Sequence, residues 1–113
     1  MTATLRQQWL HGFLDVCLLC LLAEDRDYGL GLTQRLVDAG FDEIPGGTLY
    51  PSLLRLEKQG LVQTDWVKST TGPRRKYYEL TPAGRVAVAE RIASWREFRG
   101  SIDSVTERAV IAP

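Results

Sequence analysis

Residues 46–60 read GGTLYPSLLRLEKQG, and they predict a helix of about three turns around which the chain is organised. Thr48 can cap its N-terminus, because the hydroxyl accepts a hydrogen bond from a free backbone amide. Pro51 falls in the first turn, where a missing backbone N–H costs nothing. Gly60 suits the C′ position, just after a helix ends.

The side chains of this helix separate into two faces when successive residues are placed about 100° apart. Leu49, Leu53 and Leu56 share one face, with the spacing of a buried stripe. The opposite side carries Thr48, Pro51, Arg55 and Lys58, with Ser52 and Gln59 on one shoulder and Tyr50 and Leu54 on the other. A leucine face for packing and a basic, hydroxyl-bearing face for contact are typical of a helix that reads the major groove of DNA.

The charge distribution supports a nucleic-acid partner, although the net charge of the 113 residues is zero. Residues 1–47 hold three basic and seven acidic groups, whereas residues 48–85 hold seven basic and three acidic groups. The middle of the chain is therefore basic. The apolar run at residues 14–23 contains Asp15 and is too short to span a bilayer, and no export signal is visible. We expect a cytoplasmic protein with no membrane partner.

The order of the predicted elements is helix, helix, helix, hairpin, helix. Helices are expected at residues 9–23 and 28–39, before the central one, and strands at residues 61–67 and 74–80. Thr81 and Pro82 are good N-cap and N1 residues for a last helix that runs to about Arg99, where Gly100 could stop or kink it. This order predicts a mainly α fold with a β-hairpin wing, a winged helix-turn-helix. We expect a DNA-binding part at residues 1–81 and a C-terminal dimerisation helix at residues 82–113, packed as one unit.

The last helix carries an apolar stripe with alternating spacings of three and four residues, which favours packing against another helix. A second copy of the chain is the economical partner, because the predicted first helix is also apolar on more than one face. Packing of the stripe on the chain's own core is the alternative. The expected interface residues are Phe13, Val88, Ile92, Trp95, Phe98, Ile102 and Val105.

Several motifs together resemble the PadR family of bacterial transcriptional regulators. They are GTLYP at residues 47–51, RLE at 55–57, GLV at 60–62, GPRRKYY at 72–78 and LTPAG at 80–84. The resemblance runs in register from about Leu14 to Trp95, and the short tail is similar to the small subfamily with one C-terminal dimerisation helix. It implies a homodimer that binds a palindromic operator on double-stranded DNA, usually as a repressor.

The candidate DNA contacts lie on the central helix and the hairpin. Arg55 can donate two parallel hydrogen bonds to a guanine, and the hairpin cations can contact phosphates or enter the minor groove. Tyr50 could equally be partly buried, and the hairpin charges could simply be solvated. The candidates are Thr48, Tyr50, Pro51, Ser52, Arg55, Lys58, Lys68, Arg74, Arg75, Lys76 and Tyr77.

An effector site is expected where aromatic residues gather at the dimer interface. Trp95 could meet its symmetry mate and, with Trp9 and Phe98, enclose a planar aromatic or phenolic molecule. The alternative is that Trp95 only fills the dimer core. Family members respond to such compounds, so the resemblance allows the effector.

Catalysis and metal binding are not predicted. Cys17 and Cys20 have a redox-like spacing, but they lie in an apolar helix without a second cysteine pair, so core packing is expected. His11 has no visible catalytic partner, and no cofactor is expected. The competing function is a winged-helix module that binds proteins and no operator.

Overall fold

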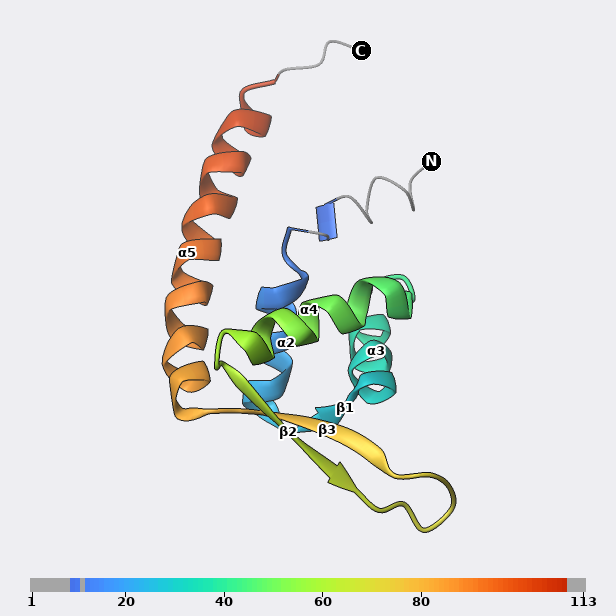
Figure 1. Ribbon diagram of the computed structural model, residues 1–113. Coiled ribbons are helices and arrows are strands. Elements are labelled where there is room, and N and C mark those ends of the chain that lie inside the picture. The colour runs from blue at the N-terminus through green and yellow to red at the C-terminus, as the bar shows by residue number, and fades with distance from the viewer. Residues whose placement is uncertain (1–8, 11, 110–113) are drawn as a thin grey trace.

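The computed structural model describes residues 9–10 and 12–109, and it shows a winged helix-turn-helix extended by one long helix (Figure 1). The predicted fold class, mainly α with a β-hairpin, is confirmed. In chain order the elements are α2 (Leu14–Glu24), β1 (Asp27–Tyr28), α3 (Gly29–Asp38), α4 (Gly46–Lys58), β2 (Val62–Val67), β3 (Arg75–Leu80) and α5 (Pro82–Glu107).

The sheet has three antiparallel strands in the order β1-β3-β2. Strands β2 and β3 form the predicted hairpin, with Thr64 opposite Tyr78 and Val62 opposite Leu80. Strand β1 was not predicted, because two residues within a charged turn carry no strand pattern. It pairs with β3 through Asp27 and Tyr28, and it thereby ties the start of α3 to the hairpin.

The core is a cluster of leucines from the three short helices. The least exposed large side chains are Leu14, Leu18, Leu19, Leu32, Leu36, Leu49, Leu53 and Leu56. The predicted inward face of α4 is therefore confirmed. Because α4 is held by this face, its other side is left for solvent or a partner.

Both glycines that follow α3 and α4 have the left-handed conformation that ends a helix. Gly60 has φ +75°, its N–H donates to the Glu57 carbonyl, and the Leu61 N–H donates to the Leu56 carbonyl. Gly40 has φ +107° and ends α3 in the same way. This hydrogen-bond pattern satisfies the last carbonyls of each helix.

The start of α4 differs from the prediction. The N-cap is Pro45, and Gly46 and Gly47 lie inside the first turn, so Thr48 does not cap the helix. The Thr48 and Leu49 amides both donate to the Pro45 carbonyl, at 2.9 and 3.0 Å. The proline ring fixes φ at −62°, which suits the extended conformation of an N-cap. No side chain caps this helix by a hydrogen bond.

The first and last helices also differ in their bounds. Residues 9–10 are helical, but a turn at Gly12 and Phe13 delays α2 to Leu14. Helix α5 runs through Gly100 without a break. Its C-terminal half extends away from the helical body, and the molecule measures 59 × 32 × 20 Å (Figure 1).

The predicted cap of α5 is confirmed, and it docks this helix on the end of α4. Thr81 Oγ1 accepts a hydrogen bond from the Gly84 amide at 3.0 Å and donates to the Gly60 carbonyl at 2.6 Å. Gly84 lies so close to the Leu61 carbonyl that a β-carbon would overlap it. The end of α4 and the start of α5 therefore form one joint.

We predict that Gly84→Ala destabilises the protein by about 1–3 kcal/mol, because the added methyl group must push α5 away from Leu61. Gly100→Ala is the matched control, since it also lies in α5 but faces open space. It should raise the free energy of unfolding by about 0.5–1 kcal/mol through helix propensity. Urea unfolding at one fixed protein concentration measures both, and equal effects at the two sites would contradict the joint.

Candidate nucleic-acid interface

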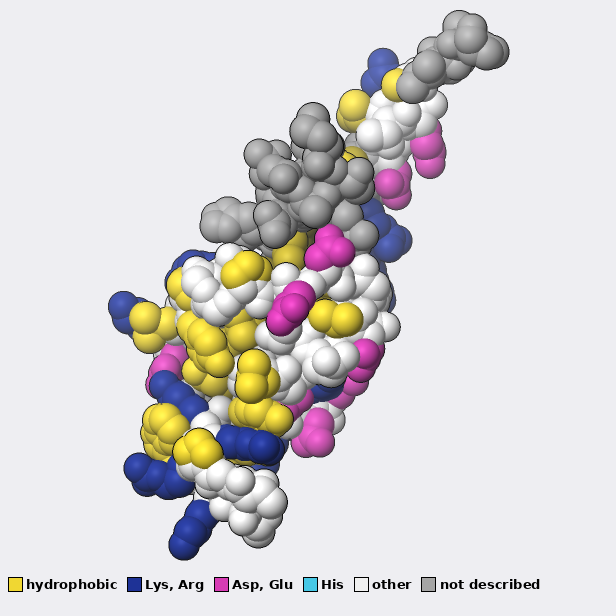
Figure 2. All heavy atoms as spheres, turned by 90° about the vertical axis from the view of Figure 1, so that its right-hand side faces the viewer, with side chains coloured by type: hydrophobic (Ala, Val, Ile, Leu, Met, Phe, Trp, Pro, Cys, Tyr) yellow, Lys and Arg dark blue, Asp and Glu magenta, His cyan; other side chains and the backbone are white. Residues whose placement is uncertain are grey.

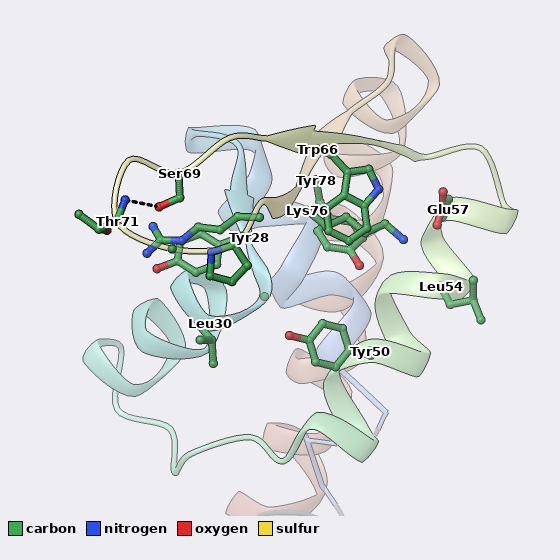
Figure 3. Close-up of a pocket in the computed structure, with 14 residues that line it drawn as sticks. Tyr28, Leu30, Tyr50, Leu54, Glu57, Trp66, Ser69, Thr71, Lys76 and Tyr78 are labelled. Atoms are coloured by element: carbon green, nitrogen blue, oxygen red, sulfur yellow. Dashed lines mark hydrogen bonds between the residues drawn. The ribbon is translucent and has the colours of Figure 1, made fainter.

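A groove of about 820 Å³ lies between the hairpin, the start of α3 and the middle and C-terminal turns of α4 (Figure 3). Helix α4 contributes Tyr50, Leu54 and Glu57 to its wall. The hairpin contributes Trp66, Lys76 and Tyr78 from its strands, and α3 contributes Leu30. The hairpin loop contributes Ser69, Thr71, Gly72 and Pro73. The groove thus brings together the helix and the hairpin that the sequence predicts as DNA contacts.

The hairpin cations rest on aromatic rings. The Arg74 guanidinium lies 5.6 Å from the ring centre of Trp66, and that of Arg75 lies 4.6 Å from the ring centre of Tyr28. Lys76 Nζ lies 5.6 Å from the ring centre of Tyr78. The rings orient these cations without cancelling their charge.

Carboxylates do not neutralise the cations of this surface within the described ranges of the chain. The ion pairs there belong to Arg35 and Arg55, and none involves the hairpin cations or Lys58. Figure 2 shows Lys and Arg side chains gathered at the hairpin end of the molecule, beside an apolar patch. This end of the protein has the charge that a phosphate backbone requires.

The outward face of α4 is mostly apolar. Tyr50 and Leu54 are 47% and 49% exposed, and Pro51 and Lys58 are also exposed, whereas Thr48 is half-buried. The Tyr50 ring lies against the start of α3, where Gly29 has no β-carbon to obstruct it. Of the two alternatives for Tyr50, the structure shows a side chain that packs on α3 and still lines the groove.

Ser52 does not face a partner, contrary to our expectation. Its side chain is buried, with 3% of the residue exposed, and its Oγ accepts a hydrogen bond from Arg55 Nη2 at 2.9 Å. A position only about 60° from Leu49 and about 40° from Leu56 on the helical wheel lies on the buried side. Ser52 therefore supports α4 from within.

Arg55, predicted from the sequence to read a base, is paired within its own chain. Its Nε donates to Asp15 Oδ2 at 3.2 Å and its Nη2 donates to Asp15 Oδ1 at 3.0 Å, so both edges of the carboxylate are used. Asp15 lies at the start of α2 and is 40 positions away in the sequence. The hydrogen bond with this carboxylate raises the pKa of the Arg55 guanidinium above its already high usual value. Arg55 is a link between α2 and α4.

Tyr77 points away from the groove. Alternation along β3 places it on the face opposite Lys76 and Tyr78, and its ring centre lies 5.5 Å from that of Tyr28. The guanidinium of Arg26 lies 5.2 Å from the Tyr77 ring centre. Tyr77, a candidate DNA contact from the sequence, therefore lies outside the groove, and its ring contacts Tyr28 of β1.

Several groove residues were missing from the predicted set. Leu54 was placed on a shoulder of α4 but not counted as a contact, and Leu30 and Trp66 were not considered. The same helical wheel and the strand alternation place Leu54 and Trp66 on the exposed side, so these two could have been found. Leu30 depends on how α3 packs, and its exposure follows from the tertiary structure.

Buried Tyr78 forms the floor of the groove. Burial raises the pKa of its hydroxyl, and the nearby Glu57 carboxylate and Tyr50 raise it further. The hydroxyl is therefore neutral at physiological pH. Glu57 itself lies beside the hairpin, where its Oε2 accepts a hydrogen bond from Thr64 Oγ1 at 3.4 Å.

A second hollow, of about 420 Å³, lies where α5 passes the start of α2. Its walls are apolar and are formed by Trp9, Leu10, Phe13, Val16, Cys17, Phe41 and Trp95. The ring centres of Phe13 and Trp95 lie 4.5 Å apart, and Phe98 lies 5.8 Å from Phe13 and 6.3 Å from Trp95. The three predicted effector residues Trp9, Trp95 and Phe98 thus lie at or beside one hollow.

The apolar stripe of α5 is only partly covered by its own chain. Val88 packs against the core, and Ile92 and Trp95 are half-buried. Phe98, Ile102 and Val105 are exposed, on the part of α5 that extends from the body (Figure 1). Packing on the chain's own core, the alternative weighed for the stripe, applies to its first residues.

Cys17 and Cys20 are both partly buried within α2. Burial raises the pKa of Cys17, and the neighbouring Cys20 raises it further, while burial and Glu24 raise the pKa of Cys20. Both are protonated at neutral pH and poorly suited to bind a metal. Among the residues that the structure describes, no three His, Cys, Asp or Glu side chains gather as a metal site. His11, considered above, lies outside the described residues.

Within residues 9–10 and 12–109, no helix combines the length and the hydropathy needed to cross a bilayer. A family profile described as "Transcriptional regulator PadR-like family" matches residues 18–90. The transcriptional regulator Rv3488 of Mycobacterium tuberculosis is 43% identical over 68 residues, which cover 60% of this chain and 62% of that one.

Solved structures agree with the sequence comparison. A PadR-like transcription factor from Bacteroides fragilis is 36% identical, with a TM-score of 0.72, and the match covers 90% of this chain and 98% of that one. A PadR family transcriptional regulator from Eggerthella lenta is 31% identical, with a TM-score of 0.80 over 95% of this chain and 93% of that one. Both the fold and the sequence of this chain are therefore similar to those of PadR-like transcriptional regulators.

We predict that Arg55→Ala and Asp15→Ala each lower the melting temperature modestly, because each leaves the other charge unpaired. The melting temperature of the double variant should be no lower than that of the less stable single variant, since both substitutions remove the same interaction. Lys58→Ala, on the same helix but without a carboxylate partner, is the control and should melt like the parent protein. If the melting temperature of the double variant fell by the sum of the two single losses, the Asp15–Arg55 ion pair would contribute nothing to stability.

Proposed function

This chain belongs to the PadR-like family of transcriptional regulators, which are DNA-binding proteins and not enzymes, and we propose that it represses transcription by binding a palindromic operator as a homodimer. The observation that carries the proposal is the groove between α4 and the hairpin, whose surrounding cations have no carboxylate partners among the described residues. Helix α4 enters the major groove, and the hairpin contacts the adjacent backbone.

The proposed DNA contacts are revised by the structure. Lys58 and the hairpin cations contact phosphates, which sets affinity and orientation but not sequence. Arg55, Ser52 and Tyr77 are omitted, because each is engaged within the chain. The proposed set is Thr48, Tyr50, Pro51, Leu54, Lys58, Lys68, Arg74, Arg75 and Lys76.

Dimerisation is proposed from the exposed part of the α5 stripe. Phe98, Ile102 and Val105 are exposed on one helix, although the Phe98 ring also contacts Phe13 and Trp95 of its own chain. Large apolar side chains in such a row mark an interface. A two-fold axis along this helix would present two copies of α4 about 34–36 Å apart, which is one turn of duplex. Residues 82–113 then serve dimerisation and residues 1–81 serve DNA binding.

The hollow beside Trp95 is the proposed effector site. Its apolar walls and its aromatic rings suit a planar aromatic or phenolic molecule. It adjoins the proposed dimer interface through Phe98. A molecule that binds this hollow in only one arrangement of the two subunits would favour that arrangement. The distance between the two α4 helices would then change, and the operator would be released.

We predict that Arg74→Ala weakens binding to every duplex and lowers the slope of log K against log salt by about one, because one phosphate contact is lost. The duplex is obtained by selection from a random pool, and fluorescence anisotropy at several salt concentrations measures the slope. Arg99→Ala, which removes a cation from the distal half of α5, should leave the slope unchanged. A protein that selects no sequence and has no salt dependence would support the competing protein-interaction module instead.

We predict that a planar aromatic probe quenches the tryptophan fluorescence of the Trp66→Phe variant, in which Trp9 and Trp95 remain to report on the hollow. Acridine and a simple phenolic acid are the probes, titrated into the free protein. Quenching should saturate, and Phe13→Ala should weaken binding about tenfold or more by removing stacked ring area. Linear quenching that is equal in both variants would mean that the hollow binds neither probe.

A further inference from the structure

Three large apolar side chains from three different elements are exposed on the groove beside α4. They are Leu30 of α3, 70% exposed, Leu54 of α4, 49% exposed, and Trp66 of β2, 57% exposed. Figure 3 shows them around one hollow, with Tyr50 and Tyr78 between them. Isolated exposed apolar residues are ordinary, but a group on one concave surface marks a contact.

The outward face of α4 has few groups that can form hydrogen bonds with a base. Gly47 and Pro51 offer no side-chain donor or acceptor, and Arg55 is held by Asp15. The hydroxyl of Tyr50 is the group that a β-carbon at Gly29 would meet, so it is directed at the start of α3. Lys58 is a flexible charge at the end of the helix. Thr48 is half-buried, whereas the apolar Leu54 side chain is 49% exposed, between Tyr50 and Lys58 along the helix.

The occupant of this surface is identified by charge and by shape. The unneutralised hairpin cations beside the patch attract phosphates. Glu57, on the same wall as Leu54, repels a phosphate, so the backbone is drawn to the hairpin cations and not to this wall. An apolar side chain can distinguish one base pair from another in the major groove by the C5 methyl group of thymine.

We propose that Leu54 contacts the C5 methyl group of a thymine in each half-site, so that this regulator selects its operator in part by apolar contact. The proposal rests on the proposed operator binding and adds a specificity-determining residue to it.

The test replaces each thymine of the selected duplex, one at a time, by deoxyuridine, which lacks only the methyl group. The parent protein should bind the duplex about three- to five-fold more weakly when the contacted thymine is replaced, the effect of one buried methyl group. Leu54→Ala should bind the thymine and deoxyuridine duplexes equally at that position. Leu54 is outside the core, and alanine favours the helix, so this variant should fold.

Lys58→Ala is the matched control on the same face of α4. It should weaken binding to both duplexes by the same factor and keep the ratio between them. A selected duplex to which the parent binds equally with thymine or deoxyuridine at every position would overturn this inference and leave the proposed function intact. A ratio that persists in Leu54→Ala would also overturn it. Failure to select any sequence would overturn the proposed function, and this inference with it.

Discussion

The burial of three leucines on one side of α4 is the constraint from which the functional surface follows. Leu49, Leu53 and Leu56 are nearly inaccessible, because α2 and the hairpin close over them. Burying such side chains stabilises a domain by about 1.5–3 kcal/mol each, more than any surface contact of the helix can offset. The rotation of α4 about its axis is thereby set. The side chains on the other side of α4, which include Tyr50 and Leu54, therefore face outward.

Most of the fold could be predicted from the sequence, because its signals are local. The leucine spacing, the terminal glycines and the Thr81 cap each act within one or two turns of a helix. The proposed DNA surface was harder, since it depends on pairings across the chain. Nothing near Arg55 in the sequence indicates Asp15 as its partner. The helical wheel alone therefore places Arg55 on the outward face but cannot show its pairing with Asp15.

The hairpin shows how a small domain can expose several cations and still order them. A carboxylate partner would fix each side chain but would also remove the charge that a phosphate needs. Aromatic rings from β1, β2 and β3 hold the guanidinium and ammonium groups by cation–π contact instead. Strand β1, which the sequence did not predict, contributes Tyr28 to this arrangement. The smallest element of the fold thus helps to position its charges.

The position of α2 has a mechanical meaning. Phe13, just before its first turn, forms a wall of the aromatic hollow, and Asp15, two residues later, grips Arg55 of α4. The two residues lie two positions apart, so the proposed effector hollow and the ion pair to α4 meet at the same end of α2. Arg55 connects this end of α2 directly to α4 through hydrogen bonds of 3.0 and 3.2 Å. A domain this small needs no long relay between its two ends.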